Sequence, residues 1–390
     1  MTELALALRA EIERDMGATV ELLRALVTAE SPTSVPESQA AAQALLRAAL
    51  EDLGFEVRHA AGVISGGYLL AQAANYQPGA RSQLLLGHSD TVWPLGTLAE
   101  MPFSVEEPLA RGPGVFDMKG GLAQMIAALR AMRALDLKPA LRPLALVNSD
   151  EEVGSPESSP AILALARQVE RVFVLEPALG PEGALKTARK GVGRFELEVR
   201  GRAAHAGLEP EGGVSAVLEL AHQVVALHGL NAPAEGVSVN VGVIEGGLRS
   251  NVIAPSARAI IDARAPTTAR AGQLEAALVG LEPVLVGASL QVSGGFSKLP
   301  LERTPANRRL WRLAVETAAA LGVELKEGAA GGGSDGNTTS QVTATLDGLG
   351  AVGAGAHASH EQMRLDNLAE RAALLALLLM APALSEENDD

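Results

Sequence analysis

The sequence predicts an α/β protein with a second, inserted α+β domain. Segments of helical period alternate with short apolar segments typical of strands, which is the pattern of a sheet covered by helices. The chain has 390 residues, and domains typically contain about 100 to 200, so about two domains are expected. Residues 190–297 follow the order β, α, β, β, α, β between glycine-rich turns. We therefore expect this segment to form one domain, and residues 1–189 and 298–390 to form the other.

The individual elements follow from the same periodicity. Helices are expected at Glu3–Thr28, Glu37–Leu53, Gly121–Leu135, Val214–His228, Ala269–Leu281, Pro305–Leu321 and Leu368–Met380. Strands are expected at Phe55–His59, Gln83–Gly87, Arg142–Asn148, Arg171–Leu175, Phe195–Val199, Val237–Ile244, Ala257–Ala263 and Leu290–Val292. The longest apolar run, Ala372–Leu384, is shorter than the about 20 residues that a membrane span needs, so it predicts a buried helix.

The composition excludes several classes of protein. The formal net charge is −14, so a broad basic surface for nucleic acid or anionic lipid is not expected. The chain has no cysteine, which excludes disulfides, iron–sulfur clusters and thiolate zinc sites, and any metal must be held by His, Asp and Glu. Residues 1–16 have neither the basic nor the apolar part of a secretion signal. We expect a soluble, cytoplasmic protein that binds neither nucleic acid nor membrane.

Side chains that can bind metal follow apolar or glycine-rich segments at several places. These are Leu84–Val92 with His88 and Asp90, Gly112–Gly121 with Asp117, Asn148–Gly154 with Asp150, Glu151 and Glu152, Phe173–Pro177 with Glu176, and Gly353–Glu361 with His357 and His360. Ligands gather at strand ends in open α/β sheets. Each stretch alone is more typical of a solvated loop. Their coincidence in one chain favours a shared site, where crowded carboxylates hold a cation or shift in pKa.

Within these stretches, the spacing of His88 and Asp90 is informative. At i and i+2 on a strand end the two side chains lie on the same side, so the carboxylate can accept the second imidazole N–H and orient the ring for metal binding. Other features have ordinary explanations. His59, His222 and His228 lie on a predicted strand or helix. The segment from Gly331 to Asn337 is either a flexible turn or a helix N-cap at Ser334 or Asp335.

In this order and spacing, HSDTV, GPGVFDMKGG, DEEVGS, LEP, GRAAHAG, NVIAP, GGGSDGN and GAHASHE resemble the motifs of the dinuclear zinc exopeptidases and deacylases. This family includes glutamate carboxypeptidases, aminoacylases, acetylornithine deacetylases and succinyl-diaminopimelate desuccinylases. Segments 345–353 and 205–216 are most similar to the bacterial glutamate carboxypeptidase branch. The resemblance implies a catalytic domain with a mixed sheet flanked by helices, and an inserted ferredoxin-like dimerisation or lid domain.

The resemblance also implies roles for individual residues. It makes His88 and Glu176 ligands of one zinc ion, Glu152 and His357 ligands of a second, and Asp117 the bridge between them. Glu151 becomes the general base, and Asp90 the partner of His88. Cobalt or manganese are possible substitutes for zinc. Where the family often has Asp or Asn, this chain has His360. The peptide bond after the bridging acid, Asp117-Met118, is expected to be cis.

Further roles implied by the resemblance fall in residues 190–297. His205 is the candidate donor to the oxyanion of the reaction. It would act in the active site of a partner subunit, which predicts a homodimer joined through this domain. Asn251 and Arg264 would bind the free carboxylate of the substrate, and Lys190 and Arg249 are weaker candidates for substrate binding.

These roles predict a zinc-dependent metallocarboxypeptidase that releases a C-terminal amino acid, glutamate or a similar residue, from peptidyl or N-acyl substrates. An N-acyl-amino-acid deacylase is the near alternative, because the same bond is broken. A non-catalytic family member that binds an amino-acid conjugate is the other alternative. The presence of Glu151 together with all of the expected ligands argues against the non-catalytic reading.

Overall fold

The computed structural model describes residues 1–384, which form two compact units. The first unit contains residues 1–187, 303–330 and 334–384, and the second contains residues 188–302 and 331–333. The first is built on a mixed sheet with helices, and the second on a separate four-stranded antiparallel sheet. The predicted fold class is therefore confirmed. Among the described residues, no helix combines the length and the apolar character needed to cross a membrane.

The main sheet of the first unit has the strand order β1-β2-β6-β3-β7-β14. The strands are β1 (Phe55–Ala60), β2 (Tyr68–Ala73), β3 (Ser82–His88), β6 (Arg142–Asn148), β7 (Arg171–Val174) and β14 (Ala344–Leu346). β3 runs parallel to β6 and β7, and β14 parallel to β7, whereas β1 and β2 are antiparallel additions at one edge. The carboxyl ends of β3, β6 and β7 therefore lie at one edge of the sheet.

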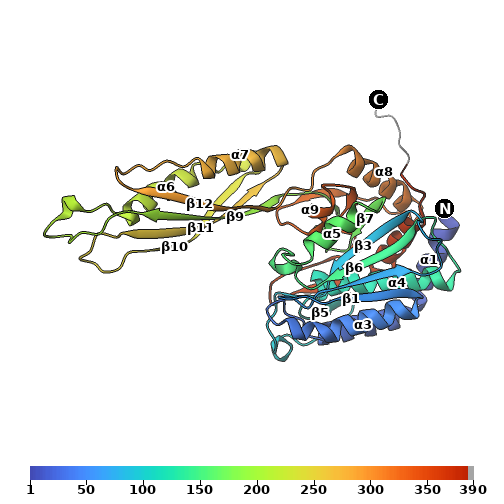
Figure 1. Cartoon of the computed structure of the whole chain (residues 1–390). Helices are drawn as coiled ribbons and strands as arrows, with labels where there is room; N and C mark the ends of the chain where they lie inside the picture. Colours follow the sequence, from blue (N-terminus) through green and yellow to red (C-terminus); the bar gives the residue numbers. More distant parts are fainter. Residues whose placement is uncertain (385–390) are drawn as a thin grey trace. The chain divides into compact units, whose positions relative to one another are not determined.

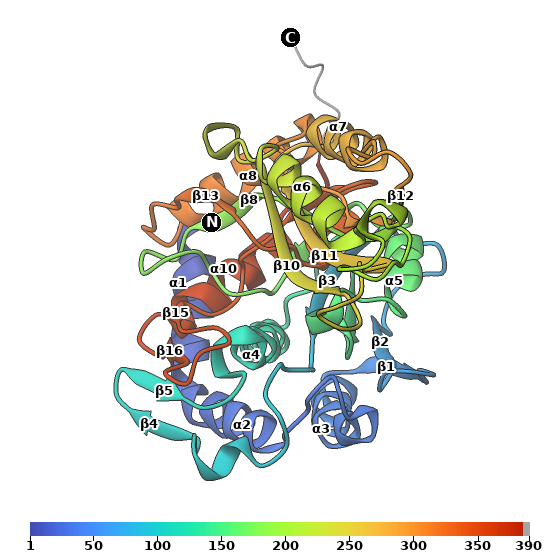
Figure 2. The same ribbon diagram turned by 90° about the vertical axis from the view of Figure 1, so that its left-hand side faces the viewer.

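These central strands are apolar and buried almost throughout, as strands covered on both faces must be. The helices of this unit, seen in Figures 1 and 2, are α1 (Thr2–Arg14), α2 (Met16–Thr28), α3 (Gln39–Asp52), α4 (Gly120–Ala134), α5 (Ser159–Ala166), α8 (Pro305–Ala319), α9 (Asp335–Thr339) and α10 (Leu368–Met380). α3, α4, α8 and α9 contact the main sheet, and α1 and α2 pack on other helices. Short strands complete the unit, namely β4 (Ser104–Glu106), β5 (Leu109–Arg111), β15 (Gly353–Ala354) and β16 (Gln362–Arg364) in one sheet, and β8 (Leu185–Arg189) with β13 (Glu327–Ala330) in another.

The predicted helix Glu3–Thr28 is wrong in one respect, because it is two helices. The chain leaves the helical conformation at Asp15, where φ is −95° and ψ is 13°. Asp and the following Gly17 are both poor helix formers. α1 packs against α4 and α10, and α2 packs against α3 and α4, so the break lets each half bury its own apolar face.

The C-terminal helix α10 is buried along almost its whole length, as its apolar sequence predicts. It packs against α1, α4 and α8. Arg171, at the start of β7, donates to the carbonyl oxygens of Leu378, Ala381 and Pro382 at distances of 2.8 to 3.1 Å. The last carbonyls of a helix have no partner inside the helix, so this buried guanidinium stabilises its end.

The second unit contains β9 (Gly191–Arg200), α6 (Ala216–His228), β10 (Ser238–Gly246), β11 (Ser256–Ala265), α7 (Thr268–Val279) and β12 (Ser289–Lys298). This is the predicted order β, α, β, β, α, β. The sheet order is β10-β11-β9-β12, and all neighbours are antiparallel. α6 and α7 lie side by side on one face of this sheet (Figures 1 and 2). They bury the alternating apolar residues of the two central strands, which are Phe195, Leu197 and Val199 of β9 and Ala257, Ala259, Ile261 and Ala263 of β11.

Candidate dinuclear metal centre

The candidate centre lies at the carboxyl edge of the main sheet in the first unit. His88 is the last residue of β3, and in the parallel register it lies opposite Asn148, the last residue of β6. Glu151 and Glu152 follow β6 in a single turn of helix, and Glu176 comes shortly after β7. Parallel pairing therefore brings together side chains that are far apart in the sequence, as the strand-end pattern predicts.

His88 is held by the segment that follows it. Its side chain is 1% exposed, and its Nδ1 lies 3.0 Å from the carbonyl oxygen and 3.3 Å from the carboxylate of Asp90. The Asp90 carboxylate also accepts the backbone N–H groups of Glu151 and Glu152 at 3.3 and 3.2 Å, and the hydroxyl of Thr33 at 2.7 Å. Asp90 thus fixes both the ring of His88 and the turn that carries the two glutamates. With Nδ1 engaged, Nε2 is the ring nitrogen that faces the site.

Asp117 lies between the two candidate histidines. It sits in the turn Val115–Lys119 that precedes α4, and the Asp117-Met118 peptide bond is cis, as predicted. Its Oδ1 is 3.4 Å from Nε2 of His88, and its Oδ2 is 3.5 Å from Nε2 of His357. One oxygen of the same carboxylate therefore faces each histidine, which is the arrangement that a bridging ligand requires.

Two groups of side chains result, which we call the first group and the second group. The first contains His88, Glu176 and Asp117, with 3.5 Å between His88 Nε2 and Glu176 Oε1. The second contains His357, Glu152 and Asp117, with 3.1 Å between His357 Nε2 and Glu152 Oε2. Ligand atoms about 2.0 to 2.2 Å from a tetrahedral zinc ion lie about 3.3 to 3.6 Å from one another. The observed spacings are close to this value.

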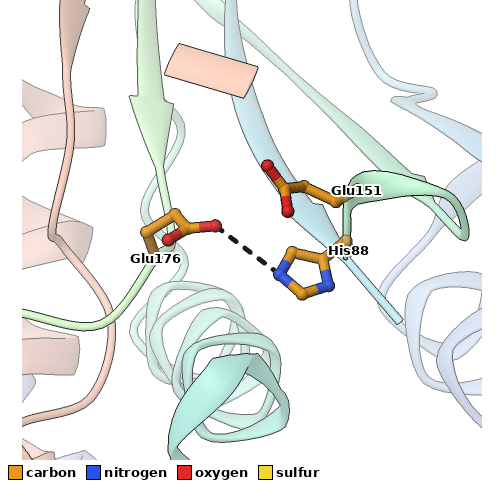
Figure 3. Close-up of side chains that lie close together, drawn as sticks. All are labelled: His88, Glu151 and Glu176. Atoms are coloured by element: carbon orange, nitrogen blue, oxygen red, sulfur yellow. Dashed lines mark ion pairs between the residues drawn. The ribbon is translucent and has the colours of Figure 1, made fainter. Parts of the chain in front are cut away.

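Glu151 lies beside the first group. Its carboxylate is near the imidazole of His88 and the carboxylate of Glu176, with one potential ligand atom of each residue within 4.8 Å of the others. In Figure 3, Glu151 and Glu176 direct their carboxylates toward the ring of His88 from two sides, and the ion pair of His88 with Glu176 is marked. The third acid of this stretch, Asp150, points elsewhere. It accepts the backbone N–H groups of Glu157 and Ser158 at 2.8 and 3.0 Å and so shapes the loop.

Buried polar atoms test whether these residues fit a metal. Nε2 of His88, Oδ1 of Asp117 and Oε1 of Glu152 are buried and have no hydrogen-bond partner among the described residues. Buried polar atoms are nearly always paired, so three orphan atoms in one cluster point to a missing partner. All three are metal-ligand atoms, and imidazole with carboxylate is a donor set that suits zinc. The residues present therefore fit a pair of divalent cations.

The pKa values of the two histidines in the protein without metal also fit a site for cations. Hydrogen bonds to Asp117 and Glu152 raise the pKa of His357 to about 10. Burial alone would lower the pKa of His88, but Asp117, Asp90 and Glu176 around the ring raise it well above its usual value. Protons on the two histidines thus balance the surrounding carboxylates when no cation does. Because a metal needs neutral imidazole, metal binding should release these protons.

The candidate residues of the second unit lie in two places. His205 and Asn251 are neighbours, since His205 pairs with Val252 in an isolated bridge and Ala206 N–H donates to the Asn251 carbonyl at 3.0 Å. Arg249 lies in the same exposed turn. Nδ1 of His205 accepts the backbone N–H groups of Gly207 and Leu208, both at 3.1 Å, so a neutral ring carries its proton on Nε2.

Arg264 lies at the other end of this sheet. It pairs with Val192 near the start of β9, whereas the turn with Asn251 precedes Ser256, which pairs with Arg200 at the end of β9. At about 3.3 Å per residue, the part of β11 from Ser256 to Arg264 spans roughly 26 Å, and Asn251 lies beyond Ser256. Within one chain they cannot bind the same carboxylate. Arg264 already holds Asp262 in a bidentate ion pair at 2.8 Å. Lys190, just before β9, lies at this same end.

Sequence reasoning missed two charged residues near the candidate ligands. Lys186 on β8 is 8% exposed, and its Nζ lies 3.9 Å from Glu176 Oε2. Glu361 is 1% exposed and accepts the N–H of Asp117. The only signal for Glu361 was its place four residues after His357, and the strand pattern around Lys186 gave none. His360, by contrast, is exposed.

Comparison with known proteins shows which family the chain resembles along its length. The model of peptidase family M20/M25/M40 matches residues 84–381. Carboxypeptidase G2 of Pseudomonas sp. strain RS-16 is 30% identical over 379 residues, which cover 94% of this chain and 89% of that protein. Acetylornithine deacetylase of Salmonella arizonae is 32% identical over 220 residues, 53% of this chain and 54% of that one.

Solved structures show that the fold is shared. Aminopeptidase PepT of Bacillus cereus superposes with a TM-score of 0.76 at 21% identity, covering 94% of this chain and 98% of that one. The metallo-carboxypeptidase Sso-CP2 of Sulfolobus solfataricus superposes with a TM-score of 0.70 at 16% identity, with the same two coverages. Because the family model spans most of the chain and the likeness to carboxypeptidase G2 extends over nearly all of it, this protein belongs to the M20/M25/M40 family of metal-dependent peptidases and amidohydrolases.

Proposed function

We propose that the protein is a carboxypeptidase that uses two zinc ions to release a C-terminal amino acid, glutamate or a similar residue, from a peptidyl or N-acyl group. The observation that carries this proposal is the cluster in which Asp117 faces both His88 and His357 while Glu151 stands beside the first group. The carboxypeptidase assignment draws on similarity to carboxypeptidase G2 along 94% of the chain.

In this proposal each side chain of the first unit has one task. The first group would hold one ion and the second group the other, with cobalt or manganese as possible substitutes for zinc. Bound ions of this kind polarise the scissile carbonyl and acidify a water molecule. Glu151 accepts the proton of the attacking water and returns it to the leaving nitrogen, acting first as general base and then as general acid. Asp90 keeps His88 and the Glu151 turn in place through the contacts described above.

The second unit would supply the groups that recognise the reacting amide and the free carboxylate. His205 carries its proton on Nε2, because Nδ1 is occupied by two backbone N–H groups, and so it can donate to an oxyanion. Arg264 would bind the substrate carboxylate in the place of Asp262. Lys190 and Arg249 are candidates for a side-chain carboxylate of the substrate, because a chain of net charge −14 needs local cations to hold glutamate.

The same proposal includes a homodimer. Asn251 and Arg264 lie at opposite ends of the second unit, so one carboxylate can meet both only if they come from two chains. The edge strand β10 offers a surface for such pairing, with exposed Val243 and Ile244 and a free edge among the described residues. We infer that His205 and Asn251 act in the active site of the partner subunit, in an isologous arrangement.

An N-acyl-amino-acid deacylase is the second candidate function. The observation that favours it is the similarity to acetylornithine deacetylase, although this covers only 53% of the chain. The two functions share the bond that is broken and differ in the acyl group and in the amino acid that is released.

Steady-state kinetics on matched substrates test the proposal. The zinc-loaded protein should hydrolyse glutamate conjugates with a higher kcat/KM than the alanine or leucine conjugates of the same acyl group, and dialysis against a chelator should abolish both activities. A preference for neutral conjugates would replace the glutamate assignment by a general aminoacylase. Equal activity with and without metal would contradict the metal-dependent mechanism itself.

A further inference from the structure

Glu361 is a buried carboxylate in the loop that carries His357. Its Oε2 accepts the indole N–H of Trp93 at 2.8 Å and the backbone N–H of Gly114 at 2.9 Å. Its Oε1 accepts the backbone N–H groups of Phe116 and Asp117 at 2.9 and 3.0 Å. Each oxygen thus takes two donors, and the side chain is only 1% exposed.

The four donors come from separate parts of the candidate centre. Trp93 belongs to the segment that follows His88 and Asp90, and Gly114, Phe116 and Asp117 form the loop of the bridging acid. Glu361 itself lies four residues after His357. One carboxylate therefore joins the loop of Asp117, the loop of His357 and the segment after β3. The backbone of Glu361 also packs closely against Gly355, because a Cβ at Gly355 would lie 3.0 Å from Glu361 Cα.

The two groups differ in how much they need such a connection. In the first group, His88 and Glu176 stand at the ends of paired strands, and these side chains are only 1% and 9% exposed. In the second group, the His357 side chain is 51% exposed and comes from a loop, where its φ is +61°. The sheet and Asp90 position His88, and the end of β7 positions Glu176, whereas His357 reaches Asp117 from a loop that hydrogen bonds must hold.

We propose that Glu361 is a positioning residue that sets the spacing between His357 and Asp117, so that metal binding by the second group depends on it strongly, whereas the first group shares only Asp117 with that loop and keeps His88 and Glu176 on the sheet. This inference rests on the proposed function, because it presupposes that both groups bind metal. Residues that orient the ligands of a metal typically contribute 10-fold to 100-fold to its affinity. Here that contribution would fall mainly on the ion of the second group.

A carboxylate is needed for this role because of the number of acceptors. Glutamate offers two acceptor oxygens, and both are used, whereas glutamine has one oxygen and a donor amide in place of the other. Glu361→Gln keeps the size of the side chain but loses two of the four hydrogen bonds and directs an NH₂ group at two N–H donors. A milder variant is Trp93→Phe, which removes a single donor and keeps an aromatic ring.

Glu219 offers a matched control in the second unit. It is also fully buried, and its carboxylate accepts the backbone N–H groups of Val284 and Leu285 and the side-chain amide of Gln223 at distances of 2.7 to 3.1 Å. Glu219→Gln therefore causes the same kind of damage to a buried carboxylate, far along the chain from every candidate ligand. Any effect that both variants share is a general consequence of lost stability.

The experiment measures zinc binding by chelator competition on the full-length chain, with absorption spectra of the cobalt-substituted protein as a second readout. Wild type and Glu219→Gln should bind two ions with the same two affinities. Glu361→Gln should keep one tight site and lose 10-fold to 100-fold in the other, with the cobalt spectrum of only one site changed. Trp93→Phe should shift the same site by a smaller factor, and it decides the matter if Glu361→Gln does not fold.

Three results would overturn the inference. One is a second affinity in the Glu361 and Trp93 variants within twofold of wild type. Another is an equal loss at both sites, and the third is the same loss in Glu219→Gln. If the wild type itself does not bind two ions, the proposed function is refuted, and the inference with it. If the wild type binds two ions and only the variants give one of the three results above, the inference alone is refuted.

Discussion

The two units place their candidate functional residues in opposite ways. In the first unit, His88, Asp117 and Glu176 converge at one buried edge of a sheet, and each touches another candidate residue. In the second unit, His205 and Arg264 lie at opposite ends of an antiparallel sheet. In our proposal, the first unit therefore holds metal with residues of a single chain. In the same proposal, the second unit completes an active site only when two chains contribute, and the predictions below test this difference.

The largest expected effect is at Glu151, in the first unit. Glu151→Gln keeps the shape of the side chain but removes the proton acceptor, so kcat should fall by about 10²-fold to 10⁴-fold. Zinc content should stay at the wild-type value, which elemental analysis measures. If the variant loses metal, Glu151 is a ligand of the first group rather than the base. If it keeps its activity, another residue carries the proton.

The next largest effect is at His205, in the second unit. Removing one oxyanion donor should lower kcat by about 10²-fold to 10³-fold in His205→Ala, with no change in zinc affinity. Mixing this variant with Glu151→Gln should restore activity after subunit exchange, because in a heterodimer one of the two sites receives both intact residues. Random exchange makes about half of the dimers mixed, so about one quarter of wild-type activity is expected. No recovery after verified exchange would place His205 in its own chain's site.

Arg264 should show a smaller effect. Losing a charge-assisted hydrogen bond to a carboxylate costs about 1.5 to 3 kcal/mol, so Arg264→Ala should lower kcat/KM by roughly 10-fold to 150-fold for every substrate. Asp262→Ala is the informative companion, because Asp262 now holds the guanidinium. If substrate must displace Asp262, this variant should lower KM or leave it unchanged. A rise in KM as large as that of Arg264→Ala would show that Asp262 is needed to orient the arginine.

The smallest effects concern helix caps, one in each unit. Thr304 caps α8 of the first unit, and Ser215 caps α6 of the second, each through its side-chain oxygen. Thr304→Ala and Ser215→Ala should each lower the free energy of unfolding by about 1 kcal/mol. Urea denaturation followed by probes specific to each unit would show which transition moves. Separate shifts would indicate units that unfold independently, and a joint shift a single cooperative unit.

The sequence was most informative where function follows directly from position on a strand. His88 ends an apolar strand and Glu151 and Glu176 each follow one, and a parallel sheet with aligned ends brings the three together. For the segment from Gly331 to Asn337, the sequence left a flexible turn and an N-cap at Ser334 or Asp335 open, and the structure has the N-cap at Ser334, at the start of α9. Such features depend on local pattern and on a rule about where strands end.

Other features depend on contacts that no local pattern encodes. Glu361 looks like an ordinary loop acid until the fold surrounds it with four donors from other segments. Asn251 and Arg264 flank one strand in the sequence, and only the length of β11 shows that they cannot meet in one chain. The break at Asp15 is a third case. The helical period of the sequence continues through this residue, but the two halves pack against different helices, and only the fold shows that.

The place of α10 in the first unit has a consequence for synthesis on the ribosome. The second unit is complete once residue 333 has been made, and nearly all of it by residue 302. The first unit begins with α1, yet one of the helices against which α1 packs is α10 (Leu368–Met380), near the other end of the described chain. Domains generally fold as units while the chain emerges. We therefore expect the second unit to reach its native state before the first. Until α10 has been made, the apolar faces of α1 and α4 stay exposed, and we expect chaperones to protect them from aggregation.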